Sequence, residues 1–231
     1  LISHTFKLME MFNCHEFMTY IQSYLGLLEA SAVVLGLAFI VCIIRRQRVG
    51  WLFGVAQCIL SVVLFAELKL YAEAALYGLY ALFGVYGWWS WSANQGGEVL
   101  IGRISIAVLM TLSAIGVVLS VGTGYLMRTL TDSPRPFLDS FTSVFGLLAT
   151  WLEAKQFLEA WHYWIILNGI SIGLYIDRGA SFYAGLMGIY FVMSFIGLRK
   201  WKRALSSYVP SIIFCTLKSV EFIILINKYT K

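Results

Sequence analysis

The sequence predicts an all-α polytopic membrane protein, with seven transmembrane helices in a 3+1+3 arrangement of two parallel three-helix repeats around one further helix. Three observations predict this fold: the composition, a series of long apolar runs and an internal repeat. Of the 231 residues, 60% are hydrophobic and only 13% are charged, whereas soluble domains carry about 25% charged residues. Disorder is excluded as well, because it requires low hydrophobicity.

Apolar runs separated by short polar turns supply the predicted spans, since a bilayer-crossing helix needs about 20 residues. The predicted spans are 24–44, 51–66, 70–91, 104–127, 138–152, 161–176 and 181–198. Residues 1–23 are predicted as an amphipathic segment lying on the membrane surface. Residues 204–231 form a C-terminal tail, whose stretch from Pro210 to Ile226 is interrupted by Lys218 and Glu221. This stretch favours an interfacial helix or a non-native tail over an eighth span.

The two halves of the chain are similar to each other at an offset of 110 residues, without a gap. The offset pairs Trp51 with Trp161 and Trp91 with Trp201, and it also pairs three glycines with glycines. The repeats therefore lie in residues 24–91 and 138–203. A three-helix unit ends on the opposite side of the membrane from where it begins, so the two repeats are parallel only if one helix, within 92–137, connects them.

The distribution of basic residues predicts the orientation. If the helices alternate in direction, nine Lys and Arg residues in the connections fall on one side and five on the other. Since short cytoplasmic loops are enriched in Lys and Arg, we expect the N-terminus outside and the C-terminus inside. The net charge of +5 lies mainly in these clusters beside apolar runs, so no nucleic-acid partner is expected.

Motifs of membrane enzymes are absent from the sequence. It contains no HExxH, no GxSxG, no Gly-rich phosphate loop and no spacing typical of metal ligands. We therefore expect no enzyme, no cofactor and no metal. A seven-helix receptor is disfavoured by the repeat, because parallel repeats are typical of carriers that bind substrate between their halves.

The sixth predicted span contains the strongest candidate site. Trp161, Trp164 and Asn168 follow at i, i+3 and i+7 and share one helical face. They predict an aromatic slot with an amide at its floor, suited to a flat heterocycle. The alternative is interfacial tryptophan for Trp161 and a helix–helix hydrogen bond for Asn168. Gln57 lies at the matching depth in the second span, with the same two alternatives.

The third span and its repeat mate supply weaker candidates. Glu73, Tyr77 and Tyr80 share one face, and Tyr183 and Tyr190 share the equivalent face of the seventh span. A carboxylate among aromatic rings would favour a cationic ring, although Glu73 lies close enough to the outer boundary to be simply hydrated. Trp88, Trp89 and Trp91 are predicted as interfacial belt residues.

With the repeat, the Trp161-x-x-Trp164-x-x-x-Asn168 motif and the segment Tyr86-Gly-Trp-Trp-Ser-Trp91, the chain resembles the PnuC family of bacterial vitamin transporters. Within that family it is most similar to the nicotinamide riboside transporters, whose relatives carry thiamine or riboflavin. The resemblance implies a SWEET-like, homotrimeric facilitator of the bacterial inner membrane, with uptake driven by phosphorylation of the riboside inside the cell. It also implies that Trp164 packs on the nicotinamide ring, Asn168 binds an amide or ribose, and Trp161 shapes the slot.

Overall fold

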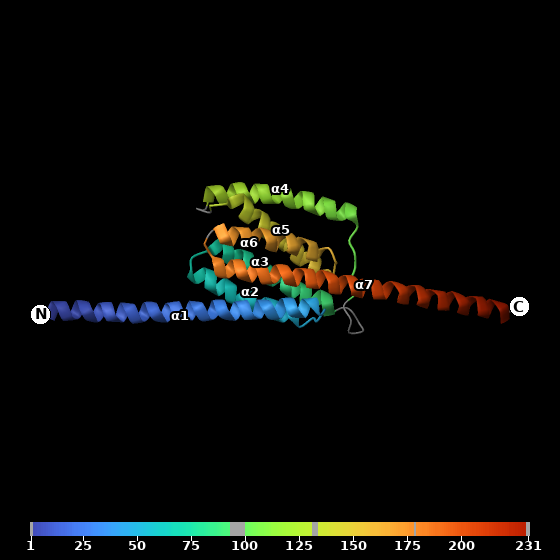
Figure 1. Cartoon of the computed structure of the whole chain (residues 1–231), viewed down its shortest axis with the longest axis horizontal. Coiled ribbons are helices and arrows are strands. Elements are labelled where there is room, and N and C mark those ends of the chain that lie inside the picture. The colour runs from blue at the N-terminus through green and yellow to red at the C-terminus, as the bar shows by residue number, and fades with distance from the viewer. Residues whose placement is uncertain (1, 93–99, 131–133, 178, 230–231) are drawn as a thin grey trace.

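Seven helices make up the described part of the chain (Figure 1). The computed structural model describes the backbone of residues 2–92, 100–130, 134–177 and 179–229, and the side chains of residues 23–207 within these ranges. The helices are α1 (Ile2–Ile44), α2 (Gly50–Glu67), α3 (Tyr71–Ser92), α4 (Ile106–Leu130), α5 (Pro136–Ala154), α6 (Ala160–Asp177) and α7 (Ser181–Tyr229). The predicted all-helical fold is confirmed.

The first and last helices are longer than the predicted spans. Helix α1 begins at Ile2 and includes most of the segment 1–23, and α7 continues through Pro210 to Tyr229. Figure 1 shows both helices extending beyond the bundle, in opposite directions. The side chains of residues 2–22 and 208–229 are outside the described part, so the predicted amphipathic and interfacial faces remain predictions.

Among the residues whose side chains are described, four stretches are long and apolar enough to cross a membrane: Ser23–Ile44, Gly50–Glu67, Ile106–Leu130 and Ser181–Ser207. Helices α3, α5 and α6 were also predicted as spans, but they are rich in Trp and Tyr or carry acidic residues, which lowers their hydropathy. They lie inside the bundle beside the apolar helices (Figure 1). The count of seven spans therefore stays a prediction.

Neighbouring helices pack within each half of the chain: α1 with α2, α2 with α3, α5 with α6, and α6 with α7. The halves meet where α3 packs on α5 and where α1 packs on α7. Helix α4 packs on α5 through Gly116, Ser120 and Gly124, one small residue per turn, with the Phe145 ring over Gly116. Small residues let two helices approach closely in an apolar environment.

The turns of the two halves are built alike. The turn after α1 has Arg46 at φ 60°, with the Gln47 N–H bonded to Cys42 O at 2.8 Å. The turn after α5 has Gln156 at φ 65°, with the Phe157 N–H bonded to Leu152 O at 2.9 Å. These are Schellman caps, in which a left-handed residue lets the next N–H reach the helix end. Lys69 and Gly179 repeat the arrangement after α2 and α6.

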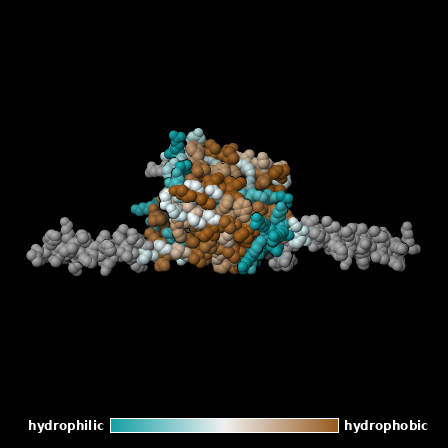
Figure 2. All heavy atoms as spheres, in the orientation of Figure 1, coloured by the Kyte–Doolittle hydropathy of each residue, from teal (hydrophilic) through white to brown (hydrophobic). Residues whose placement is uncertain are grey.

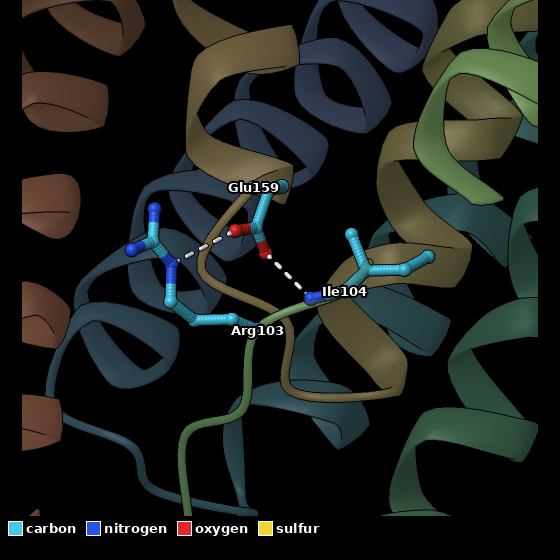
Figure 3. Close-up of polar contacts among 3 residues, drawn as sticks. All are labelled: Arg103, Ile104 and Glu159. Atoms are coloured by element: carbon cyan, nitrogen blue, oxygen red, sulfur yellow. Dashed lines mark hydrogen bonds and ion pairs between the residues drawn. The ribbon is translucent and has the colours of Figure 1, made fainter. Parts of the chain in front are cut away.

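The segment leading into α4 is fastened to the turn between α5 and α6 (Figure 3). Gly102 forms an isolated parallel β-bridge with Phe157. Beside this bridge, Glu159 bonds Arg103 Nε through one oxygen and the backbone N–H of Ile104 through the other, each at 3.2 Å. Glu159 is only 7% exposed, so a buried carboxylate attaches α4 to the second half of the chain.

The surface of the bundle is mostly apolar. Figure 2 shows hydrophobic residues along the middle of the helices and hydrophilic residues toward the two ends, with the larger group near the turn after α1. We call this the basic end, because the turn after α1 and the middle of α7 place basic residues there. They are Arg45, Arg46, Arg48, Arg199, Lys200, Lys202 and Arg203.

Candidate functional site

Polar and aromatic side chains from both halves meet in the middle of the bundle. Gly36 of α1 provides room for them, because a methyl group there would lie 2.6 Å from the Tyr190 hydroxyl and 3.0 Å from Gln57 Oε1. At the repeat-related position, the Tyr80 hydroxyl lies against Gly146 of α5. Thus Gln57 of α2 approaches Tyr190 of α7, and Tyr80 of α3 approaches α5.

Tyr77 connects these groups. Its ring stacks on Phe65 with centroids 5.2 Å apart and meets Tyr80 edge-on at 6.0 Å. Its hydroxyl is also within electrostatic range of Tyr175, Tyr190 and Cys58. The side chains that surround this point form what we call the central polar group: Gln57, Cys58, Tyr77, Tyr80, Tyr175 and Tyr190.

Asn168 lies next to this group and bonds across two helices of the second half. Its amide nitrogen donates to the Ser194 hydroxyl at 3.1 Å, and Ser194 in turn donates to the backbone oxygen of Tyr190 at 2.7 Å. Asn168 is 8% exposed and Ser194 is fully buried. The structure therefore contains the helix–helix hydrogen bond that was the alternative for Asn168, and a contact with substrate remains a prediction.

The two tryptophans of the motif have different surroundings. Trp161 is fully buried, with its ring over Gly197 and edge-on to Trp201 at 5.4 Å. It is therefore part of the core rather than of an interfacial belt. Trp164 is half-buried and packs against the core from α6.

Four buried tryptophans close the basic end of the bundle: Trp51, Trp91, Trp161 and Trp201. Trp91 of α3 donates its indole N–H to Ala154 O of α5, and Trp201 of α7 donates to Ile43 O of α1. Both bonds run between the halves. The sequence-based assignment of Trp91 to the belt is wrong, because Trp91 is 3% exposed and packs on Trp201 at 6.1 Å. Trp89, at 68% exposure, fits the belt.

Toward the opposite end of the bundle, the Tyr183 ring stacks on Tyr175 of the central polar group, with ring centroids 5.5 Å apart. The Tyr183 hydroxyl donates to Glu29 Oε1 and so joins α7 to α1. Glu73, the repeat mate of Tyr183, is exposed in the first turn of α3 and lies outside the central polar group. Arg135 and Asp177 form an ion pair at 2.8 Å between the beginning of α5 and the end of α6.

Two shallow hollows on the surface of the bundle lie away from the central polar group. One, of about 350 Å³, is lined by Arg199, Lys202, Arg203 and Ser206. The other, of about 330 Å³, is lined by apolar residues of α3 and by Trp151. Neither hollow is lined by a residue of the central polar group, and hydrogen bonds between the halves lie at both ends of the bundle.

Sequence reasoning missed Glu153, which lies in the last turn of α5 and is 2% exposed. Its Oε2 oxygen has no hydrogen-bond partner among the described residues. An acidic residue within the end of an apolar run was the available signal, because ionisable groups in such segments are expensive and usually functional.

A family model described as nicotinamide mononucleotide transporter matches residues 26–203, about three quarters of the chain. The chain belongs to this family. The resemblance to PnuC transporters is thereby confirmed, and a membrane transporter rather than an enzyme is the class that its relatives represent.

Two relatives of the transporter are the nicotinamide riboside transporters PnuC of Escherichia coli (strain K12) and Shigella flexneri. Each is 23% identical over 207 residues, which covers 77% of this chain and 85% of the relative. The crystal structure of the vitamin B3 transporter PnuC superposes with a TM-score of 0.66 at 22% identity, and it covers 82% of this chain and 86% of that one. At this identity the superposition establishes the shared fold.

Proposed function

We propose that this transporter carries nicotinamide riboside across the bacterial inner membrane, with its N-terminus outside and its C-terminus inside. The observation that carries the proposal is the central polar group: amide, thiol and phenol side chains between aromatic rings, beside the buried amide of Asn168. Such residues suit a flat, amide-bearing ring and the hydroxyls of a ribose.

The charge of the site favours the riboside over its phosphorylated form, although the family description names the mononucleotide. The central polar group contains no Lys or Arg, and the described basic side chains lie in the turns, toward the helix ends or in the middle of α7 at the basic end. A phosphate would lose its hydration there without a cationic partner, which is costly in a membrane. Phosphorylation of the riboside inside the cell would then trap it and drive net uptake.

The mechanism we propose is alternating access between two parallel repeats, α1–α3 and α5–α7, with α4 as the connecting helix. It is supported by the matching turns at an offset of 110 residues and by the paired contacts of α1 with α7 and α3 with α5. Rocking of one repeat against the other exposes a central site to each side in turn. All seven helices would span the membrane in this arrangement, as in SWEET-type carriers.

Calorimetry on the detergent-purified full chain tests the substrate. We expect micromolar or tighter binding of nicotinamide riboside, and none of nicotinamide mononucleotide. Trp164→Ala and Asn168→Ala should each weaken riboside binding at least tenfold, because each removes one side of the slot. Trp89→Ala is the matched control, since Trp89 is exposed. Wild-type affinity in both site variants would contradict the proposed site.

The second candidate is the same carrier with thiamine, riboflavin or another nucleoside as substrate. Any flat heterocycle can stack on the aromatic rings of the site, so competition by these compounds in the same titration separates the candidates. We also propose a homotrimer, which native mass spectrometry would detect as three times the chain mass of 26.0 kDa.

A further inference from the structure

A fully buried serine lies beside the amide of the candidate site. Ser194 of α7 donates its hydroxyl proton to the backbone oxygen of Tyr190, one turn earlier in the same helix, at 2.7 Å. Because a serine hydroxyl has a single proton, its oxygen can then only accept a further hydrogen bond. Asn168 of α6 supplies that bond, since its amide nitrogen lies 3.1 Å from the Ser194 hydroxyl oxygen.

These two bonds decide which end of the Asn168 carboxamide faces Ser194. Turning the amide over would bring two acceptor oxygens together without a proton between them, which is costly in a buried place. The amide nitrogen therefore faces Ser194, and the carboxamide oxygen points away from it. Among the described residues this is the hydrogen bond that the Asn168 side chain makes, so its oxygen has no donor there. The oxygen is thus available to a ligand.

The first half of the chain shows that this pair is not required by the fold. The repeat mates of Asn168 and Ser194 are Cys58 and Gly84, and glycine has no side chain that could accept a bond. Val55 occupies the corresponding space, because a methyl group at Gly84 would lie 2.7 Å from its side chain. The helices can therefore pack here without a hydrogen bond, whereas the second half places an oriented amide at this depth.

We propose that Ser194 is a positioning residue for substrate recognition, which holds the Asn168 carboxamide with its oxygen toward the substrate, where it accepts an N–H from the substrate's own carboxamide. The role rests on the proposed function, because it assigns Asn168 to the substrate. A ring that bears an amide is then selected over the same ring bearing a carboxylate. A carboxylate has no N–H to donate, and its negative oxygens would meet another acceptor.

Calorimetry on the detergent-purified full chain tests this role with nicotinamide riboside and with nicotinic acid riboside, whose ring bears a carboxylate. The wild-type protein should bind the amide at least about tenfold more tightly than the acid, because the acid leaves the Asn168 oxygen unpaired. Ser194→Ala removes the acceptor, so the amide can turn over and offer its nitrogen to a carboxylate. This variant should bind the amide riboside about fivefold more weakly, and its preference for the amide should fall to about twofold.

A double-mutant cycle separates this role from a general loss of packing. In an Asn168→Ala background, which has no amide to orient, Ser194→Ala should change neither the affinity nor the preference any further. Ser120→Ala is the matched control, because Ser120 of α4 is another buried serine that donates to the backbone oxygen one turn earlier. It should leave the affinity for both ligands unchanged.

Two results would overturn the role of Ser194 while leaving the proposed function standing. One is an unchanged preference for the amide in Ser194→Ala or no such preference in the wild type, since a merely structural change weakens both ligands alike. The other is an equal loss of affinity from Ser194→Ala in the wild-type and Asn168→Ala backgrounds. Absence of binding of nicotinamide riboside by the wild-type protein would instead overturn the proposed function, and this role with it.

Discussion

At the scale of single residues, the contact between the halves at the basic end depends on two indole N–H groups. Trp91 and Trp201 are repeat mates, and each donates to the last turn of the first helix of the other half. Two further tryptophans of the same cluster, Trp51 and Trp161, have indole N–H groups without a partner among the described residues. Within one cluster, the effect of an indole that donates a hydrogen bond can therefore be compared with that of an indole that does not.

Trp91→Phe and Trp201→Phe should each lower the melting temperature of the purified protein. A lost hydrogen bond costs about 1 kcal/mol, which corresponds to roughly 2–4 °C in a chain of this size. Trp51→Phe is the control, since it removes a similar ring area from the same cluster but breaks no hydrogen bond. Equal melting temperatures for Trp91→Phe and Trp51→Phe would show that the bond contributes nothing.

The sequence identified most of the residues that meet at the centre, but not their partners. Tyr77, Tyr80 and Tyr190 were found from helical spacing, and Gln57 from its depth in the second span, which are both local properties. The bond of Asn168 to Ser194, and that of Trp91 to Ala154, depend on how neighbouring helices are rotated against each other. One-helix periodicity contains no such information, and the same limit explains why Trp91 was assigned to the lipid boundary.

At the scale of helices, glycines set the distances between neighbours within each half. Gly87 of α3 lies against the Trp51 ring of α2, and Gly197 of α7 lies against the Trp161 ring of α6. The helices were predicted to within a few residues, because apolar runs and turn residues mark their ends. The continuation of α1 and α7 was not predicted, since the polar residues in these segments suggested a break.

Gly87→Ala should destabilise the protein by about 1–3 kcal/mol, the usual cost of overpacking a core. The added methyl group would lie 2.5 Å from the Trp51 ring, which is too close for either helix to stay in place. Gly78→Ala on the same helix is the control, because nothing lies within 4 Å of that position. Thermal unfolding in detergent measures both, and equal stability of the two variants would rule out close packing at Gly87.

At the scale of the whole molecule, the halves are joined at both ends. The indole bonds of Trp91 and Trp201 join them at the basic end, and the bond from Tyr183 to Glu29 joins them at the opposite end. The central polar group lies between these two closures. In the proposed alternating-access cycle, weakening one closure should therefore open the site toward that end only.

Cys58, 8% exposed in the central polar group, can report this opening. The test uses a protein in which Cys14, Cys42 and Cys215 are replaced by Ser, so that Cys58 is the labelled thiol. Tyr183→Phe should raise the rate of maleimide labelling of Cys58 about fivefold from the end of the bundle opposite the basic end. Trp201→Phe should raise this rate about fivefold from the basic end. One lost hydrogen bond of about 1 kcal/mol shifts a population by that factor. Labelling in right-side-out and inverted vesicles distinguishes the ends.

Tyr125→Phe is the control for this labelling, because Tyr125 is 59% exposed on α4. It should leave the rate unchanged from either side. If Tyr183→Phe or Trp201→Phe increased labelling from both ends equally, the bundle would be loosening as a whole rather than opening at one end. The proposal that each end is closed separately would then be wrong.

The segment before α4 is bonded to the turn after α5, so α4 belongs structurally with the helices that follow it. The chain is therefore made of a three-helix part and a four-helix part. The bonds of Glu159 to Arg103 and Ile104, and the bridge between Gly102 and Phe157, keep α4 with the C-terminal helices. A gene interrupted between the codons for residues 92 and 100 would therefore encode a three-helix fragment and a four-helix fragment. Co-expressed, these two pieces should recombine into a working transporter, whereas an interruption between α4 and α5 would leave the connecting helix on the wrong piece.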